Sequence, residues 1–142
     1  GGSGNVGIGT STPTHPLHMG SGAHVTTAGV WTNASDARLK TNVVNTNYGL
    51  QTVMQLRPVN YTMVKGGEAQ VGFLAQEVQK IVPEVISGTE GDITKGETLG
   101  LSYGNLVPVL TKAIQEQQTT IEAQQKQIDE LTKLVNQLMY KK

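Results

Sequence analysis

The fold is decided by the C-terminal stretch Leu106–Tyr140, which reads LVPVLTKAIQEQQTTIEAQQKQIDELTKLVNQLMY. Apolar residues recur there in a strict seven-residue repeat, which is the pattern of a coiled coil. One set of core positions, a, holds only β-branched residues, and the other set, d, holds Leu or Gln. The a positions are Val107, Ile114, Ile121, Ile128 and Val135, and the d positions are Leu110, Gln117, Gln124, Leu131 and Leu138.

A single amphipathic helix on a globular core is the alternative explanation of this apolar stripe. A helix of that kind has a wider apolar face with a period of about 3.6 residues, whereas this repeat keeps to seven along its whole length. We therefore predict an oligomerising coiled coil over residues 105–142. Asn105 or, alternatively, Ser102 is expected to cap the helix, with Pro108 in its first turn.

The two glutamine layers bear on the oligomeric state. Buried amides cost stability unless they pair, and in a parallel trimer three copies of Gln117 or Gln124 can hydrogen-bond around the axis and fix the register. In the simplest rule, however, β-branched a positions with Leu at d favour a dimer. The seam alone thus leaves both stoichiometries open.

Composition excludes several classes of function. The chain has 142 residues, a formal net charge of zero and no cysteine. Neutrality gives no electrostatic reason to expect a nucleic acid or an anionic membrane as partner, and no apolar run reaches the length of about 18 residues that suggests a membrane span. The lack of cysteine removes disulfides, thiolate zinc sites and cysteine nucleophiles. We expect no cofactor.

Residues 35–104 carry mixed signals, so we predict a small α+β domain of short strands and helices. Alternating apolar residues predict a hairpin that turns at Gly66-Gly67. The expected core places Val71, Phe73, Val78 and Ile81 against Leu50, Val53 and Met54. The predicted elements are a strand start at 38–44, helices at 47–56 and 75–82, hairpin strands at 59–63 and 71–73, a loop at 87–97 and a last strand at 98–103.

Residues 1–34 are rich in Gly, Ser, Thr and His. Asn5–Thr10 predicts a short strand that has too few side chains to bury anything alone, and Pro13 and Pro16 break it. We expect this segment to be a β-rich stub, the end of something longer that sits in an assembly. His15, His18 and His24 are metal-ligand types, but their spacing is not diagnostic of a metal site, and we predict none.

Ser35 and Lys40 form a candidate catalytic pair in the run NASDARLK, residues 33–40. A neutral lysine can take the proton of a serine hydroxyl, but the lysine must first be desolvated or lie near another cation. Arg38 could supply that cation, whereas Asp36 would favour the ammonium form. The simpler alternative is that Ser35-Asp36 forms a turn or cap beside solvated basic residues.

Four stretches of the chain carry a family resemblance. Together they resemble the intramolecular chaperone, or auto-processing, domain that ends many phage tail spikes and tail fibres and also occurs in myelin regulatory factor proteins. In the order of the chain they are Ser35-Asp36-x-Arg38-Leu39-Lys40-x-Asn42, then Leu56-Arg57-Pro58-Val59-x-Tyr61, then Gly72–Val78 with Pro83-Glu84-Val85, and finally Leu101-Ser102-Tyr103-x-x-Leu106-x-Pro108.

The resemblance implies a homotrimer that registers the preceding fibre region of its own chain and then cuts itself off. By position, Ser35 would be the nucleophile, Lys40 its base, and the bond between Ala34 and Ser35 the cleavage site. Such a protein would belong to a virion tail fibre or spike, or to a bacterial surface fibre, and the released chaperone would stay in the producing cell's cytoplasm. The rival interpretation is a non-cleaving trimerisation tip of a fibre or adhesin.

Overall fold

The computed structural model describes residues 4–140 and divides the chain into two compact units, with the boundary after Val44. We call residues 4–44 the N-terminal unit and residues 45–140 the C-terminal unit. Residues 1–3 and 141–142, the outer ends of the predicted stub and coil, lie outside the described residues. The predicted limits at 34/35 and 104/105 stay predictions.

The N-terminal unit contains one small sheet with the strand order β1-β2-β3-β4. The first pair is parallel and the other two pairs are antiparallel. The strand predicted in Asn5–Thr10 is present as β1, and the chain returns through the segment with Pro13 and Pro16 to pair with it. The strands are β1 (Val6–Ile8), β2 (Leu17–Met19), β3 (His24–Val25) and β4 (Trp31–Thr32).

This sheet encloses no core of its own. None of residues 4–44 is buried, and Val6 and Ile8 are 55% and 53% exposed. Strands of two or three residues need further apolar packing to be stable in water. Within residues 4–44 the sheet is therefore small and open to solvent on both faces.

The strand predicted to start at Arg38–Val44 is wrong. Ala37–Leu39 forms one turn of 3-10 helix, η1, and no strand follows it within the N-terminal unit. Asp36 is the N-cap of this turn, and its side chain accepts a hydrogen bond from the backbone N–H of Arg38. This local bonding competes with strand pairing, as is usual for Asp.

The C-terminal unit begins with two small antiparallel pairs of strands. In the first pair, β5 (Val59–Thr62) and β6 (Ala69–Gly72) form the predicted hairpin. Gly66 and Gly67 both adopt positive φ in its turn, a conformation that costs glycine little. The second pair joins β7 (Ile86–Gly88) to β8 (Leu99–Leu101).

The second pair corrects one prediction. β8 lies where the last strand was expected, but residues 87–97 were expected to be loop throughout. The structure instead places Ser87 and Gly88 in β7, and Ile93–Lys95 forms a 3-10 turn, η3. A three-residue strand with one apolar side chain leaves no periodic signal in the sequence.

Two short helices fall within the predicted helical segments. α1 (Leu50–Val53) precedes Pro58, and α2 (Ala75–Val78) continues in a hydrogen-bonded turn to Val82 before Pro83 opens the 3-10 turn η2 (Pro83–Val85). Proline lacks the amide proton needed to continue a helix, which explains the stop at Pro83.

The core of the C-terminal unit is small and mainly aliphatic. Val78 and Val82 are each 1% exposed, and Val85, Leu106 and Val109 complete the buried cluster. Of the predicted core, Val78 is correct, and Phe73, Ile81 and Val53 pack at its edge.

The same prediction is wrong for Val71 and Met54, which are 72% and 73% exposed. Strand β6 ends at Gly72, so Phe73 turns into the core without carrying Val71 to the same face. Met54 follows Val53 by one residue, a step of about 100° that turns it away from the core.

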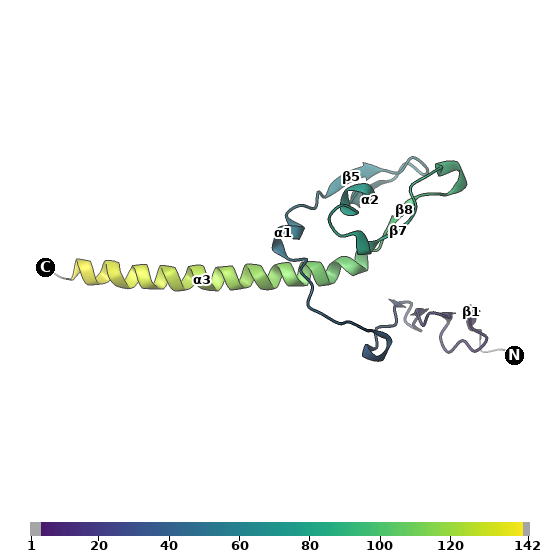
Figure 1. Ribbon diagram of the computed structural model, residues 1–142, viewed down its shortest axis with the longest axis horizontal. Helices are drawn as coiled ribbons and strands as arrows, with labels where there is room; N and C mark the ends of the chain where they lie inside the picture. The colour runs from purple at the N-terminus through teal and green to yellow at the C-terminus, as the bar shows by residue number, and fades with distance from the viewer. Residues whose placement is uncertain (1–3, 141–142) are drawn as a thin grey trace. The chain divides into compact units, whose positions relative to one another are not determined.

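The predicted C-terminal helix is present as α3 (Val107–Met139). It extends well past the small elements gathered at its N-terminal end (Figure 1). The N-cap of α3 is Leu106, so Asn105 is wrong as the cap; Ser102 is the N-cap of the preceding 3-10 turn, but its side chain makes no capping hydrogen bond. Asn105 lies inside the 3-10 turn η4 (Tyr103–Leu106), which runs directly into α3 and replaces a side-chain cap.

Substitutions of two valines, one buried and one exposed, test this core. We expect Val82→Ala to lower the free energy of unfolding by about 2 kcal/mol, because it opens a cavity in the buried cluster. The matched Val71→Ala should change it by about 0.5 kcal/mol or less, because Val71 is mostly in water. Urea titrations at one protein concentration measure both, and equal effects of the two substitutions would contradict this core.

Candidate functional site

Ser35 and Lys40 lie in direct contact. The Nζ atom of Lys40 donates a hydrogen bond to the Oγ atom of Ser35 at 2.8 Å. This is within the distance over which a base can take the proton of a nucleophile. The structure thus brings together the two side chains that the sequence singled out.

The turn η1 (Ala37–Leu39) accounts for this contact. The backbone N–H groups of Leu39 and Lys40 donate to the carbonyls of Asp36 and Ala37 at 3.0 and 3.1 Å. One tight turn therefore returns Lys40 toward Ser35. The Asp36 side chain holds the turn at its start by accepting from the Arg38 N–H at 2.8 Å.

Asp36 and Arg38, the two supporting candidates, pair with each other. The Arg38 guanidinium donates to both carboxylate oxygens of Asp36, at 2.9 and 2.7 Å. These side-chain hydrogen bonds, followed by the one from the Arg38 backbone, hold the pKa of Asp36 below its usual value. The carboxylate offsets the positive charge that Arg38 would otherwise present to Lys40.

The pair is open to solvent. Ser35 and Lys40 are both exposed, so nothing in the N-terminal unit desolvates the lysine amine. In the described part of the chain, no backbone hydrogen bond holds the peptide groups of Ala34 or Ser35. The structure therefore brings the two side chains together at an exposed position of the N-terminal unit.

Two polar contacts join the other motif stretches to one another. Arg57 donates to both carboxylate oxygens of Glu77, at 3.1 and 2.5 Å, and this pairing lowers the pKa of Glu77. The Tyr103 hydroxyl accepts from the Phe73 N–H at 3.1 Å and occupies the space that a side chain at Gly72 would need. Sequence analysis missed both contacts, although opposite charges in two motif stretches were a usable signal.

The seam of α3 (Val107–Met139) is exposed along its length. Only Val109 and Ala113 are buried on this helix. They lie at positions c and g, whose centre is about 110° around the helix from the centre of a and d. The helix therefore packs on its own unit with one face and leaves the seam free. The exposed apolar seam residues from the third turn onward are Ile114, Ile121, Ile128, Leu131, Val135 and Leu138, which are 50% to 72% exposed.

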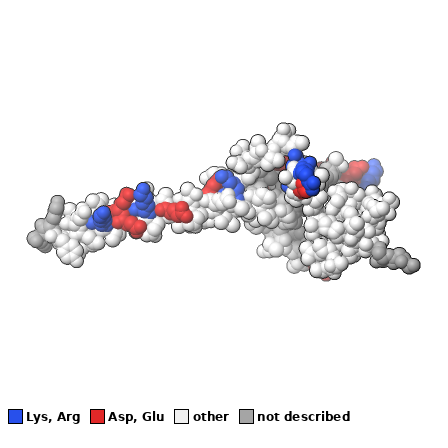
Figure 2. Space-filling model, turned by 90° about the horizontal axis from the view of Figure 1, so that it is seen from below, with Lys and Arg blue, Asp and Glu red and all other residues white. Residues whose placement is uncertain are grey.

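The polar side chains of α3 differ in their hydrogen bonding between the seam and the outer face of the helix. The side chains of Gln118 and Gln125 donate to Glu122 and Asp129 at 2.8 Å, whereas within residues 4–140 the side chains of the seam residues Gln117 and Gln124 make no hydrogen bond. Charged atoms recur along the helix between uncharged surface (Figure 2). All described charged residues of α3 take positions b, c or f: Lys112, Glu116, Glu122, Lys126, Asp129, Glu130 and Lys133.

The apolar residues of the α3 seam do not make this helix a membrane span. Within residues 4–140, no helix has the length and apolarity that a membrane crossing requires. A seven-residue apolar seam is instead typical of a helix–helix interface, and in α3 the flanking e and g positions are uncharged.

The three histidines cluster in the N-terminal unit. The rings of His15 and His24 stack with centroids 3.6 Å apart, and His18 lies 5.1 Å from His15. Desolvation first, and then the charges of His24 and His18, lower the pKa of His15. Among residues 4–140, no group of three ligand-type side chains is arranged to hold a metal ion.

The chain thus combines a mixed α+β unit, a helix with an unpaired seam, and a Ser–Lys pair in the N-terminal unit. Residues 35–87 match the model of the peptidase family S74, whose description is chaperone of endosialidase. The match begins at Ser35 and includes the first three motif stretches. It confirms the resemblance to the intramolecular chaperone domain and supports an intramolecular chaperone role; the peptidase name of the family suggests self-cleavage.

The histidine cluster predicts acid sensitivity of the N-terminal unit. Because folding lowers the pKa of His15, the unfolded state binds more protons below about pH 6.5, the ordinary imidazole value. Stability should therefore fall as the pH falls through that range. Trp31 lies in β4, so its fluorescence in urea titrations at about pH 7.5 and about pH 5.5 reports this change.

His15→Gln is the control for this prediction. Gln keeps a polar side chain but cannot be protonated, so the loss of stability between the two pH values should shrink. A wild-type urea midpoint that stays the same at both pH values would contradict the proposed role of the cluster.

Proposed function

We propose that this protein is a homotrimeric, self-cleaving intramolecular chaperone. It registers a preceding β-rich fibre or spike region and then releases itself by cutting between Ala34 and Ser35. The observation that carries the proposal is the 2.8 Å contact between Lys40 Nζ and Ser35 Oγ, located where the family match begins.

The chemistry needs no cofactor. Neutral Lys40 takes the hydroxyl proton of Ser35, and Oγ bonds to the carbonyl carbon of Ala34. The Ala34–Ser35 peptide bond then breaks, the Ser35 nitrogen takes the proton back from Lys40, and an ester joins Ala34 to Oγ. Water hydrolyses this ester, leaving a carboxylate on Ala34 and restoring the Ser35 hydroxyl. Attack within one residue exploits proximity and needs no substrate cleft.

Assembly is the proposed trigger. Lys40 is exposed in the single chain, and a lysine becomes a base at neutral pH when it is desolvated or set beside another cation. The seam of α3 supplies the means of assembly, because its apolar residues lie in water until other helices cover them. Packing between copies would then enclose the dyad.

A chaperone of this kind answers a folding problem of fibres. Intertwined β structures depend on non-local contacts, fold slowly and expose strand edges. A coiled coil raises the effective concentration of the three chains, and the layers of Gln117 and Gln124 would set their register. The N-terminal unit fits a shaft stub, because its residues 4–44 have no core of their own.

The proposed partners are two further copies of the chain and its own preceding fibre region. The proposed location is a virion tail fibre or spike, or a bacterial surface fibre, with the released chaperone in the producing cell's cytoplasm. The exposure of Lys40 favours one second candidate, a trimerisation tip that never cuts. Variants of Ser35 and Lys40 separate the two.

Assembly through the seam is tested with two variants of one helix. Ile121→Asp places a charge at position a and should convert trimers into monomers at micromolar concentration. Thr119→Asp introduces the same charge at position f, on the outer face, and should leave trimers intact. Multi-angle light scattering gives the masses, and a monomeric wild type would refute the seam as an interface.

Cleavage is tested with variants of the dyad. We expect the folded trimer to cut itself in a first-order reaction whose rate does not depend on protein concentration. Ser35→Ala should abolish cutting because the nucleophile is gone, and Lys40→Arg should abolish it because a guanidinium does not lose its proton in this range. Both variants should still form trimers.

Denaturing gels and N-terminal sequencing after refolding measure this cleavage. Sequencing should find Ser35 as the new N-terminus. Cutting of Lys40→Arg at the wild-type rate would reject the dyad. A wild-type trimer that never cuts would leave the non-cleaving tip as the function.

A further inference from the structure

One carboxylate of α3 accepts a hydrogen bond from the backbone near the start of the C-terminal unit. The Oε2 atom of Glu116 accepts a hydrogen bond from the backbone N–H of Leu50, the first residue of α1, at 2.8 Å. Lys112, one turn earlier on α3, lies 3.5 Å from Oε1 of the same carboxylate. The sequence pattern assigns no role to this contact, because Glu116 occupies an outer c position.

Gly49 lies directly against the Glu116 carboxylate. It is buried, and a Cβ atom there would collide with both carboxylate oxygens of Glu116. Its φ of −130° lies in the extended region, so a side chain at this position is opposed by the space that the Glu116 carboxylate occupies and not by backbone conformation; the carboxylate would have to shift to admit one. The carboxylate and Gly49 thus form one fitted joint between α3 and α1.

Glu116 also marks the point beyond which α3 no longer packs against the rest of its unit. From Gln117 to Met139 every residue is exposed, whereas Val109 and Ala113 just before are buried. A free helical end of this kind frays unless tertiary or quaternary contacts hold it. Pairing of the seam from Ile114 onward would therefore fix the turn that carries Glu116.

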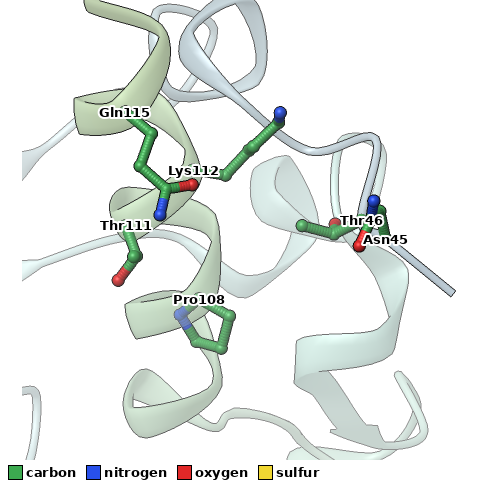
Figure 3. Close-up of a pocket in the computed structure, with 6 residues that line it drawn as sticks. All are labelled: Asn45, Thr46, Pro108, Thr111, Lys112 and Gln115. Atoms are coloured by element: carbon green, nitrogen blue, oxygen red, sulfur yellow. The ribbon is translucent and has the colours of Figure 1, made fainter. Parts of the chain in front are cut away.

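The joint lies near the first secured points of the chain after the dyad. Asn45 and Thr46 stand across an open pocket of about 230 Å³ from Pro108, Thr111, Lys112 and Gln115 of α3 (Figure 3). Two carboxylates secure the chain just beyond this pocket. Glu84 accepts from the Tyr48 hydroxyl at 2.9 and 3.0 Å, and Glu116 accepts from Leu50. Of these two, only Glu116 belongs to the helix that would assemble.

We propose that Glu116 is a positioning residue that conveys assembly of the coiled coil to α1, and through α1 to the segment that carries Ser35 and Lys40. Seam pairing orders the turn of Glu116, the ordered carboxylate holds the Leu50 amide, and the chain leading back to the dyad then has a fixed anchor. The step from α1 to cleavage rests on the proposed function; the step from the coil to α1 does not.

Hydrogen exchange of the α1 peptide tests the first step on the full chain. Glu116→Ala removes the acceptor, and Gly49→Ala displaces it without changing Glu116, so both should speed exchange about tenfold, as expected for loss of one hydrogen bond to a charged group. Glu116→Gln keeps an oxygen acceptor and should restore most of the protection. Glu122→Ala, the same change on the free part of α3, should have no effect.

A double-mutant comparison isolates the coupling. Ile121→Asp should speed exchange of α1 when Glu116 is present and add little to Glu116→Ala, while the β5–β6 hairpin peptide stays unchanged in both. Equal effects of Ile121→Asp in both backgrounds would overturn the coupling, and so would wild-type exchange in Glu116→Ala.

Cleavage rates test the second step. Glu116→Ala and Gly49→Ala should cut about tenfold more slowly while light scattering still finds trimers, and Glu116→Gln should cut nearly as fast as wild type. Slow cutting that merely follows loss of trimers would overturn a positioning role. A wild type that never cuts rejects the proposed function alone, because the exchange experiment still decides whether Glu116 couples the coil to α1.

Discussion

The constraint on which the rest of this structure depends is an apolar seam that one chain cannot cover. Ile121, Ile128 and their neighbours lie half or more in water, while α3 rests on its own unit through another face centred on Val109 and Ala113. The hydrophobic effect therefore favours association, and a strict seven-residue repeat favours it in one register. Both units have little or no buried core of their own: none of residues 4–44 is buried, and five residues form the buried cluster of the C-terminal unit.

The C-terminal unit compensates for its small core with polar contacts at its edges. The Arg57–Glu77 pair joins the start of the hairpin to α2, and the Tyr103 hydroxyl holds the amide of Phe73 at the end of β6. Both contacts are partly exposed, so each contributes modestly. Their effect is geometric, because they fix the motif stretches relative to the N-terminal end of α3.

Much of this arrangement could be predicted from the sequence. The repeat in α3, the hairpin at Gly66-Gly67 and the pairing of Ser35 with Lys40 each arise from short-range patterns. Strand β7 could not be found, because three residues with one apolar side chain carry no period. The exposure of Val71 depends on where β6 ends, and the joint of Glu116 with Leu50 depends on tertiary packing across most of the unit.

The placement of charge on α3 has a consequence for the conditions under which the seam can work. Its charged side chains occupy b, c and f, so no ion pair borders the seam at e or g. Dissolved salt screens exposed charges that are farther apart than a Debye length of about 8 Å at physiological ionic strength, and this screening does not act on contacts between uncharged side chains. An interface built in this way should associate almost equally well in dilute buffer and in a crowded, ion-rich cell.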